Sequence, residues 1–135
     1  MKLVVNVDGG SRGNPGPAAI GVVVRDESGE VIADAAEPIG TATNNVAEYR
    51  ALIRGIELAA EHGATELELR GDSELVVKQV RGEYRVKDVN LKPLHGEARS
   101  KLSSFSGWSF DHVRREHNAE ADALVIQALD AHTTL

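Results

Sequence analysis

The chain has 135 residues, of which 41% are hydrophobic and 27% charged, proportions typical of one soluble globular domain. Cysteine is absent, which excludes disulfides and thiolate metal sites, and no apolar run approaches the ~20 residues of a membrane helix. The formal net charge of -6 argues mildly against a non-specific nucleic-acid binder, although residues 78–101 are locally basic. Together these features favour a cytoplasmic protein with no membrane partner.

The first third of the chain has the pattern of three strands. Residues 2–8, 18–25 and 31–37 are rich in apolar residues and are separated by turn residues, which predicts an antiparallel meander. The segment GGSRGNPGP between the first two strands does not fit a phosphate-binding loop, because a strand rather than a helix follows it. A tight hairpin is the simpler interpretation, but it leaves Asp8, at the end of the first strand, unexplained.

Helical periodicity begins after the meander. Apolar residues recur there at three- and four-residue spacing, at Val46, Tyr49, Ile53 and Ile56. The pattern predicts a helix with Asn44 or Asn45 as its N-cap and Gly63 as its stop. Residues 65–70 then read as a short strand.

The remaining residues alternate between helices and one strand. We expect a helix from Ser73 to Gly82, an irregular stretch, a helix over 90–102, a strand over 107–114 and a helix over 118–131. The order βββαβααβα predicts an α/β fold with a mixed sheet, antiparallel first and then parallel, flanked by helices. The sequence shows no internal repeat or linker, so we expect residues 1–135 to form a single domain.

Four acidic residues fall near the ends of these elements. Asp8 and Asp72 each end a predicted strand, Glu48 lies early in the long helix, and Asp122 lies early in the last one. Ligand sites of open α/β sheets gather at the carboxyl ends of strands, so these acids would meet if their strands are parallel neighbours. Crowded carboxylates favour a hard cation such as Mg²⁺ or Mn²⁺, and two ions ~4 Å apart suit phosphoryl transfer. Each acid taken alone is also explained as a helix cap or a solvated charge.

Four motifs in order carry a family resemblance: DGGSRGNPGPAAIG at 8–21, TNNVAEYRAL at 43–52, GDSELVVKQV at 71–80 and HNAEADALV at 117–125. Together they resemble type 1 ribonuclease H in its compact bacterial and archaeal form, over residues 2 to 131. The resemblance implies a ribonuclease H-like fold with a five-stranded mixed sheet. It also implies an endonuclease that cuts the RNA strand of RNA–DNA hybrids and leaves 3′-hydroxyl and 5′-phosphate ends.

The resemblance also implies a set of site residues. Asp8, Glu48, Asp72 and Asp122 correspond to metal-binding catalytic carboxylates that hold two Mg²⁺ ions, with Mn²⁺ as a substitute. His117 corresponds to a mobile-loop histidine that assists proton transfer or product departure. The implied contacts with the hybrid are Gly10, Ser11, Arg12, Gly13, Asn14, Thr43, Asn44 and Asn45. Glu74 stands where some members have a glutamine that contacts the minor groove, and it is equally a first-turn acid that favours the helix dipole.

The sequence departs from the larger members of this family at one segment. Residues 82–91 are too few to hold their basic protrusion, which predicts weaker affinity for the hybrid. The resemblance also allows activity on RNA–DNA junctions or double-stranded RNA and implies a monomer. The rival hypothesis is a hybrid-binding domain that keeps the fold and has lost efficient catalysis.

Overall fold

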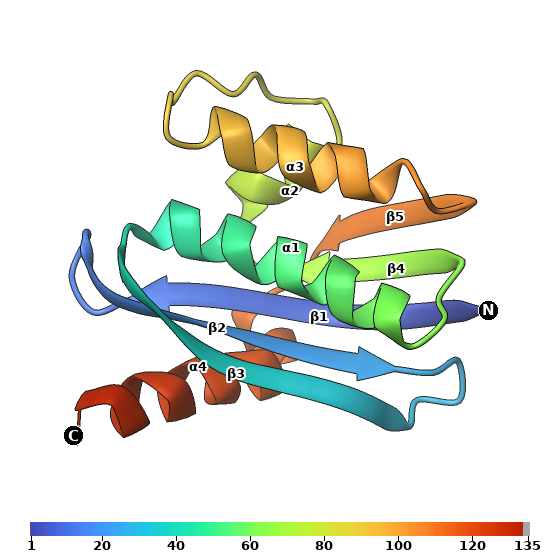
Figure 1. The fold of residues 1–135 in the computed structure, drawn as a ribbon, viewed down its shortest axis with the longest axis horizontal. Helices are drawn as coiled ribbons and strands as arrows, with labels where there is room; N and C mark the ends of the chain where they lie inside the picture. The colour runs from blue at the N-terminus through green and yellow to red at the C-terminus, as the bar shows by residue number, and fades with distance from the viewer. Residues whose placement is uncertain (134–135) are drawn as a thin grey trace.

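A five-stranded mixed sheet forms the centre of the molecule (Figure 1), of which the computed structural model describes residues 1–133. Its strands are β1 (Lys2–Ser11), β2 (Gly16–Arg25), β3 (Val31–Ala42), β4 (Glu66–Gly71) and β5 (Gly107–His112). They lie in the order β3-β2-β1-β4-β5. The first three strands pair antiparallel, whereas β4 runs parallel to β1 and β5 runs parallel to β4. This arrangement confirms the predicted mixed sheet.

Helices cover both faces of the sheet. They are α1 (Asn44–Glu61), α2 (Glu74–Val80), α3 (Lys92–Leu102) and α4 (Ala119–Thr133), and a short 3₁₀ helix, η1 (Arg115–Asn118), precedes α4. Figure 1 shows α1, α2 and α3 on one side of the sheet and α4 on the other. None of the helices in residues 1–133 has the length and apolar character needed to span a membrane.

Side-chain alternation along β1 divides the interior into two layers. Leu3, Val5 and Val7 belong to the large core between the sheet and α1–α3. Since successive side chains of a strand point to opposite faces, Asn6 and Asp8 lie on the face that α4 covers. A smaller apolar cluster joins α4 to this face, and it contains Ala19, Val125, Ala128 and Leu129.

Several element boundaries differ from the sequence-based expectations. The N-cap of α1 is Thr43 rather than Asn44 or Asn45, because its side-chain oxygen accepts a hydrogen bond of 3.2 Å from the backbone N–H of Val46. The strands β1 and β2 continue into the predicted loop, so the hairpin is shorter than expected. The strand β3 runs on to Ala42 despite a proline and a glycine, which an edge strand tolerates. Gly63, at φ +85°, follows α1 as predicted.

Candidate active site

The site lies where β4 ends earlier than its neighbour β1. The pairing of β1 with β2 continues to Ser11, but its pairing with β4 stops at Val7. Beyond Val7 the backbone of β1 therefore has an edge without a neighbouring strand. The N–H of Gly9 donates to Glu48 Oε1 at 3.2 Å, and the N–H of Ser11 donates to Asn44 Oδ1 at 2.9 Å. Side chains from the first turns of α1 thus accept hydrogen bonds from the backbone N–H groups of this edge, and one of these side chains is a carboxylate.

The absence of a side chain at Gly9 permits this arrangement. A Cβ atom at Gly9 would lie 2.2 Å from the carbonyl oxygen of Ala47, far inside van der Waals contact. Only glycine therefore lets β1 approach α1 closely enough for Glu48 to reach the backbone of β1.

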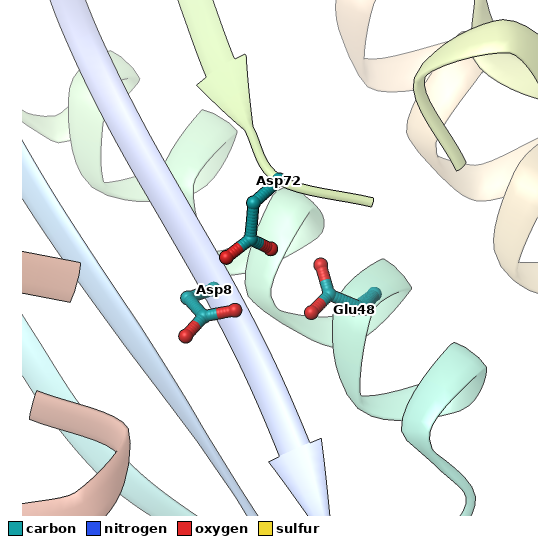
Figure 2. A group of neighbouring side chains, drawn as sticks. All are labelled: Asp8, Glu48 and Asp72. Carbon is teal, nitrogen blue, oxygen red and sulfur yellow. The ribbon is translucent and has the colours of Figure 1, made fainter. Parts of the chain in front are cut away.

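Three of the four acids that the sequence places near element ends converge at this edge (Figure 2). Asp8 projects from β1, Asp72 follows the last residue of β4, and Glu48 projects from α1. One carboxylate oxygen from each of the three lies within 4.8 Å of the other two. The parallel pairing of β1 with β4 brings the two aspartates together. Asp8 is the most enclosed of the three, with 5% of its surface exposed.

Burial and the repulsion of neighbouring carboxylates disfavour the charged forms of Asp8 and Glu48. Burial, followed by the charges of Glu48 and Asp72, raises the pKa of Asp8 to about 10. Burial and the charge of Asp72 raise the pKa of Glu48 to about 7. A divalent cation would relieve this repulsion, and carboxylate oxygens are the donors that Mg²⁺ and Mn²⁺ prefer. The donor set therefore fits a hard metal ion.

Asp122 reaches the same place from the opposite face of the sheet. Asp122 lines the same cavity as Asp8, and its side chain is a further, smaller cause of the raised pKa of Asp8. The helix α4 packs directly on β2, because a Cβ atom at Gly21 would lie 2.2 Å from the carbonyl oxygen of Ala121. This close packing brings Asp122 over the end of β1.

The carboxylates line an open cavity of about 430 Å³. Three of the predicted hybrid contacts, Gly10, Ser11 and Asn44, also line it. The wall formed by α4 is apolar and consists of Val125, Ile126 and Leu129. The cavity thus combines an acidic floor with one polar and one apolar wall.

Arg115 also lines the cavity, and sequence reasoning missed it. Its Nη2 atom lies 3.5 Å from Asp122 Oδ1, and its side chain is 79% exposed. In the sequence Arg114 and Arg115 are adjacent and look alike. Only the path of η1 decides which of the two arginines faces the acids, so no sequence signal separates them.

Asn14 and Thr43, two of the predicted contacts, accept hydrogen bonds at the start of α1. The backbone N–H of Asn44 donates to Asn14 Oδ1 at 3.0 Å, and Asn14 does not line the cavity. Thr43 uses its hydroxyl oxygen as the N-cap of α1. Gly13, with φ +102°, lies in the turn of the hairpin, and Asn45 is exposed at the start of α1.

The other predicted contacts lie outside the cavity lining. Arg12 forms an ion pair with Asp130 of α4. Glu74 pairs with Lys78 at 2.6 Å, and this partner lowers the pKa of Glu74. That pairing favours the interpretation of Glu74 as a first-turn acid of α2. His117 is exposed on η1 and lines a separate hollow together with Arg25 and Arg70.

The sheet order, together with the carboxylates where the pairing of β1 with β4 ends, defines a ribonuclease H-like protein with an acidic site that could hold a metal ion. Residues 6–128 match the family model described as "Reverse transcriptase-like". The chain is 50% identical over 123 residues to "Ribonuclease HI" of Halobacterium salinarum, an alignment that covers 91% of this chain. The chain belongs to the ribonuclease H family and is a compact homologue of ribonuclease H1.

Solved structures agree with this assignment. The crystal structure of RNase H1 from Halobacterium salinarum superposes with a TM-score of 0.95 at 46% identity, covering 97% of this chain and 99% of that one. LC11-RNase H1 in complex with RNA/DNA hybrid superposes with a TM-score of 0.93 at 43% identity, covering 97% and 99%. The chain spans 62% of the length of the curated Halobacterium relative and 36% of that of the mycobacterial relatives it matches.

Proposed function

We propose that this protein hydrolyses the RNA strand of RNA–DNA hybrids endonucleolytically and leaves 3′-hydroxyl and 5′-phosphate ends. The observation that carries the proposal is the convergence of Asp8, Glu48 and Asp72 on an open cavity in a chain of the ribonuclease H family. A solved relative bound to an RNA/DNA hybrid supports this choice of substrate. RNA–DNA junctions and double-stranded RNA are further candidate substrates.

The four acids supply the chemistry of the site. Asp8, Glu48, Asp72 and Asp122 would hold two Mg²⁺ ions, with Mn²⁺ as a substitute. Ions held by these residues would supply activation of the attacking water and stabilisation of the leaving oxygen in an in-line displacement. The protein contributes rigid positioning, because the acids project from β1, α1, α4 and the end of β4 rather than from a flexible loop.

The hairpin and the start of α1 would bind the hybrid through its minor groove. The amide oxygens of Asn14 and Asn44 accept from backbone N–H groups, which turns their NH₂ groups away as donors. Such donors, with Asn45 and the hydroxyl of Thr43, suit base edges and 2′-hydroxyls in a wide, shallow groove. The backbone near Gly10, Ser11 and Gly13 would approach RNA closely, and Arg12 would contact a phosphate.

We further propose that His117 carries a proton or assists product departure. It precedes Asp122 by five residues and lies on η1, which also carries Arg115 of the cavity lining. Histidine is suited to proton exchange near neutral pH. Replacing His117 with alanine should slow turnover without abolishing it, as measured by initial rates at saturating hybrid. Full activity of this variant would remove His117 from the mechanism.

A cleavage assay with purified protein tests the proposed function. A 5′-labelled hybrid is incubated with Mg²⁺, Mn²⁺ or EDTA, alongside single-stranded RNA, double-stranded RNA, an RNA–DNA junction and DNA duplex. We expect metal-dependent cleavage of the RNA in the hybrid, with a 3′-hydroxyl on the labelled product. Binding of the hybrid without metal-dependent cleavage would instead support the rival, a hybrid-binding domain. Gel filtration in the same buffer tests whether the protein is a monomer, as expected. The absence of cysteine favours a cytoplasmic location.

A further inference from the structure

Two buried asparagines join the start of α4 to β1. Asn118 is 2% exposed and Asn6 is 8% exposed. Asn6 Nδ2 donates to Asn118 Oδ1 at 3.0 Å, and Asn118 Nδ2 donates to the carbonyl oxygen of Val7 at 2.9 Å. Buried amides are costly unless they are hydrogen-bonded, and here each bond crosses between elements more than 100 residues apart in the sequence.

The chemistry of the groups fixes how both amides are oriented. The carbonyl of Val7 can only accept, so the NH₂ group of Asn118 must face it. The oxygen of Asn118 then faces Asn6, which must present its own NH₂ group. The pair therefore has one satisfied arrangement, and this arrangement specifies where the start of α4 lies relative to β1.

Asn118 does not act here as an ordinary helix cap. It directly precedes α4, a position where asparagine commonly bonds the N–H groups of the helix. Both of its side-chain hydrogen bonds in the described structure run to β1 instead. Its side chain thus fixes the helix to the strand rather than closing the helix end.

The two ends of this connection are adjacent to two of the acids. The carbonyl of Val7 belongs to the peptide group that continues into Asp8. Asp122 follows Asn118 by four residues, a spacing that places both on one side of a helical turn. We propose that Asn118 is a positioning residue that holds Asp122 over Asp8 and thereby strengthens the binding of a divalent ion that these acids share. This inference rests on the proposed function of the site.

Metal binding without substrate gives the first test. Mg²⁺ or Mn²⁺ is titrated into the folded protein, and dissociation constants are read from the NMR amide signals of Asp8 and Asp122. Asn118→Ala should weaken the affinity seen at Asp122 by about 10- to 100-fold, as for other residues that orient metal ligands. Ala128→Gly is the matched control, because Ala128 is buried in α4 but does not line the cavity. Equal affinities for Asn118→Ala and the wild type, or an equal loss in both variants, would overturn the proposal.

Kinetics give the second test. Asn118→Ala should lower kcat and raise the Mg²⁺ requirement while leaving KM for the hybrid unchanged. Because Asn118 acts through Asp122, adding Asn118→Ala to Asp122→Asn should produce no further loss. If the double variant instead loses kcat by the product of the two single losses, Asn118 supports the fold generally. That result would refute a role through Asp122.

A milder variant covers the case in which Asn118→Ala does not fold. Asn6→Ala removes one of the two bonds and leaves the bond from Asn118 to Val7 in place. Asn6→Ala should cause a smaller loss of metal affinity, and this loss should disappear in the Asp122→Asn background. An unchanged metal affinity of Asn6→Ala would overturn the proposal. The metal titration needs no cleavage, so the failure of the proposed function and the failure of this inference are distinguishable.

Discussion

Asp8 combines burial with repulsion from neighbouring acids. It is 5% exposed, and its pKa is raised first by burial and then by Glu48 and Asp72. Such a group destabilises the metal-free fold whenever it ionises. The same crowding gives a divalent ion a strong electrostatic reason to bind. At the scale of single residues, the crowding of acids around Asp8 therefore lowers the stability of the metal-free protein and raises the affinity of the site for a cation.

Asp72→Asn separates these two effects. The substitution removes an anionic ligand and little volume, so we expect loss of cleavage together with an unchanged or higher melting temperature in EDTA. If the ligand contributes about 4 kcal/mol to stabilising the transition state, the rate falls by about 10³-fold. Initial cleavage rates and thermal melts measure the two effects. Asp111→Asn, at an exposed position on β5, is the matched control and should leave both unchanged. Full activity of Asp72→Asn would contradict the metal assignment.

Arg115 supplies positive charge at the rim of an acidic cavity. Since its side chain is largely exposed beside Asp122, we expect it to contact a phosphate of the substrate. Arg115→Ala should raise KM for the hybrid. It should also reduce the slope of log binding constant against log salt concentration by about 1, the amount expected for one lost phosphate contact. Arg114→Ala is the control, because Arg114 is equally exposed and does not line the cavity. Equal effects of the two substitutions on KM at several salt concentrations would argue against a specific contact.

At the scale of elements, the meeting of Asp8 with Asp72 was predictable, whereas the exact strand ends and the connection after β5 were not. Asp8 and Asp72 each follow a short apolar run, and the parallel pairing of β1 with β4 then forces their convergence. The positions of Arg115 and Asn118 depend on η1, a single short turn with no hydrophobic periodicity. The N-cap at Thr43 was missed because three adjacent residues, Thr43 to Asn45, are all good caps. Local sequence therefore indicates the acids of the site but not the residues that orient them.

Two glycine substitutions, one at a tightly packed position and one at an open position, should change stability in opposite directions. Gly21→Ala places a Cβ 2.2 Å from the Ala121 carbonyl oxygen and should destabilise the protein by about 1–3 kcal/mol. Because α4 carries Asp122, its displacement should also lower activity. Gly96→Ala in α3 meets no atom within 4 Å and should stabilise by about 1 kcal/mol without changing activity. Denaturant unfolding and initial rates measure both outcomes. A neutral Gly21→Ala variant would show that α4 can shift without cost.

At the scale of the whole molecule, charge is distributed unevenly. The chain carries a formal net charge of -6, yet Arg85, Lys92 and Arg99 line a hollow between α2 and α3. Basic side chains in this hollow would attract the backbone of a polyanion, while the acids at the end of β1 would repel it until a cation binds. Metal binding would thus weaken an electrostatic barrier to the proposed hybrid substrate and also relieve a source of instability.

The stability of the metal-free protein should consequently fall with rising pH. The folded-state pKa values of Glu48 and Asp8 are raised to about 7 and about 10, so the fold binds their protons more tightly than the unfolded chain does. The stability from these protons is complete below about pH 4 and is lost as pH rises through about 7 and then toward 10. Saturating Mg²⁺ should reverse this loss, and the gain in melting temperature should be larger at about pH 9 than at about pH 6. Thermal melts in EDTA and in Mg²⁺ across this range measure the effect. Asp72→Asn should make the profile in EDTA less steep without removing the slope, because the burial of Asp8 and Glu48 remains. A melting temperature in EDTA that stays constant over the same range would show that the three carboxylates do not repel one another in the folded protein.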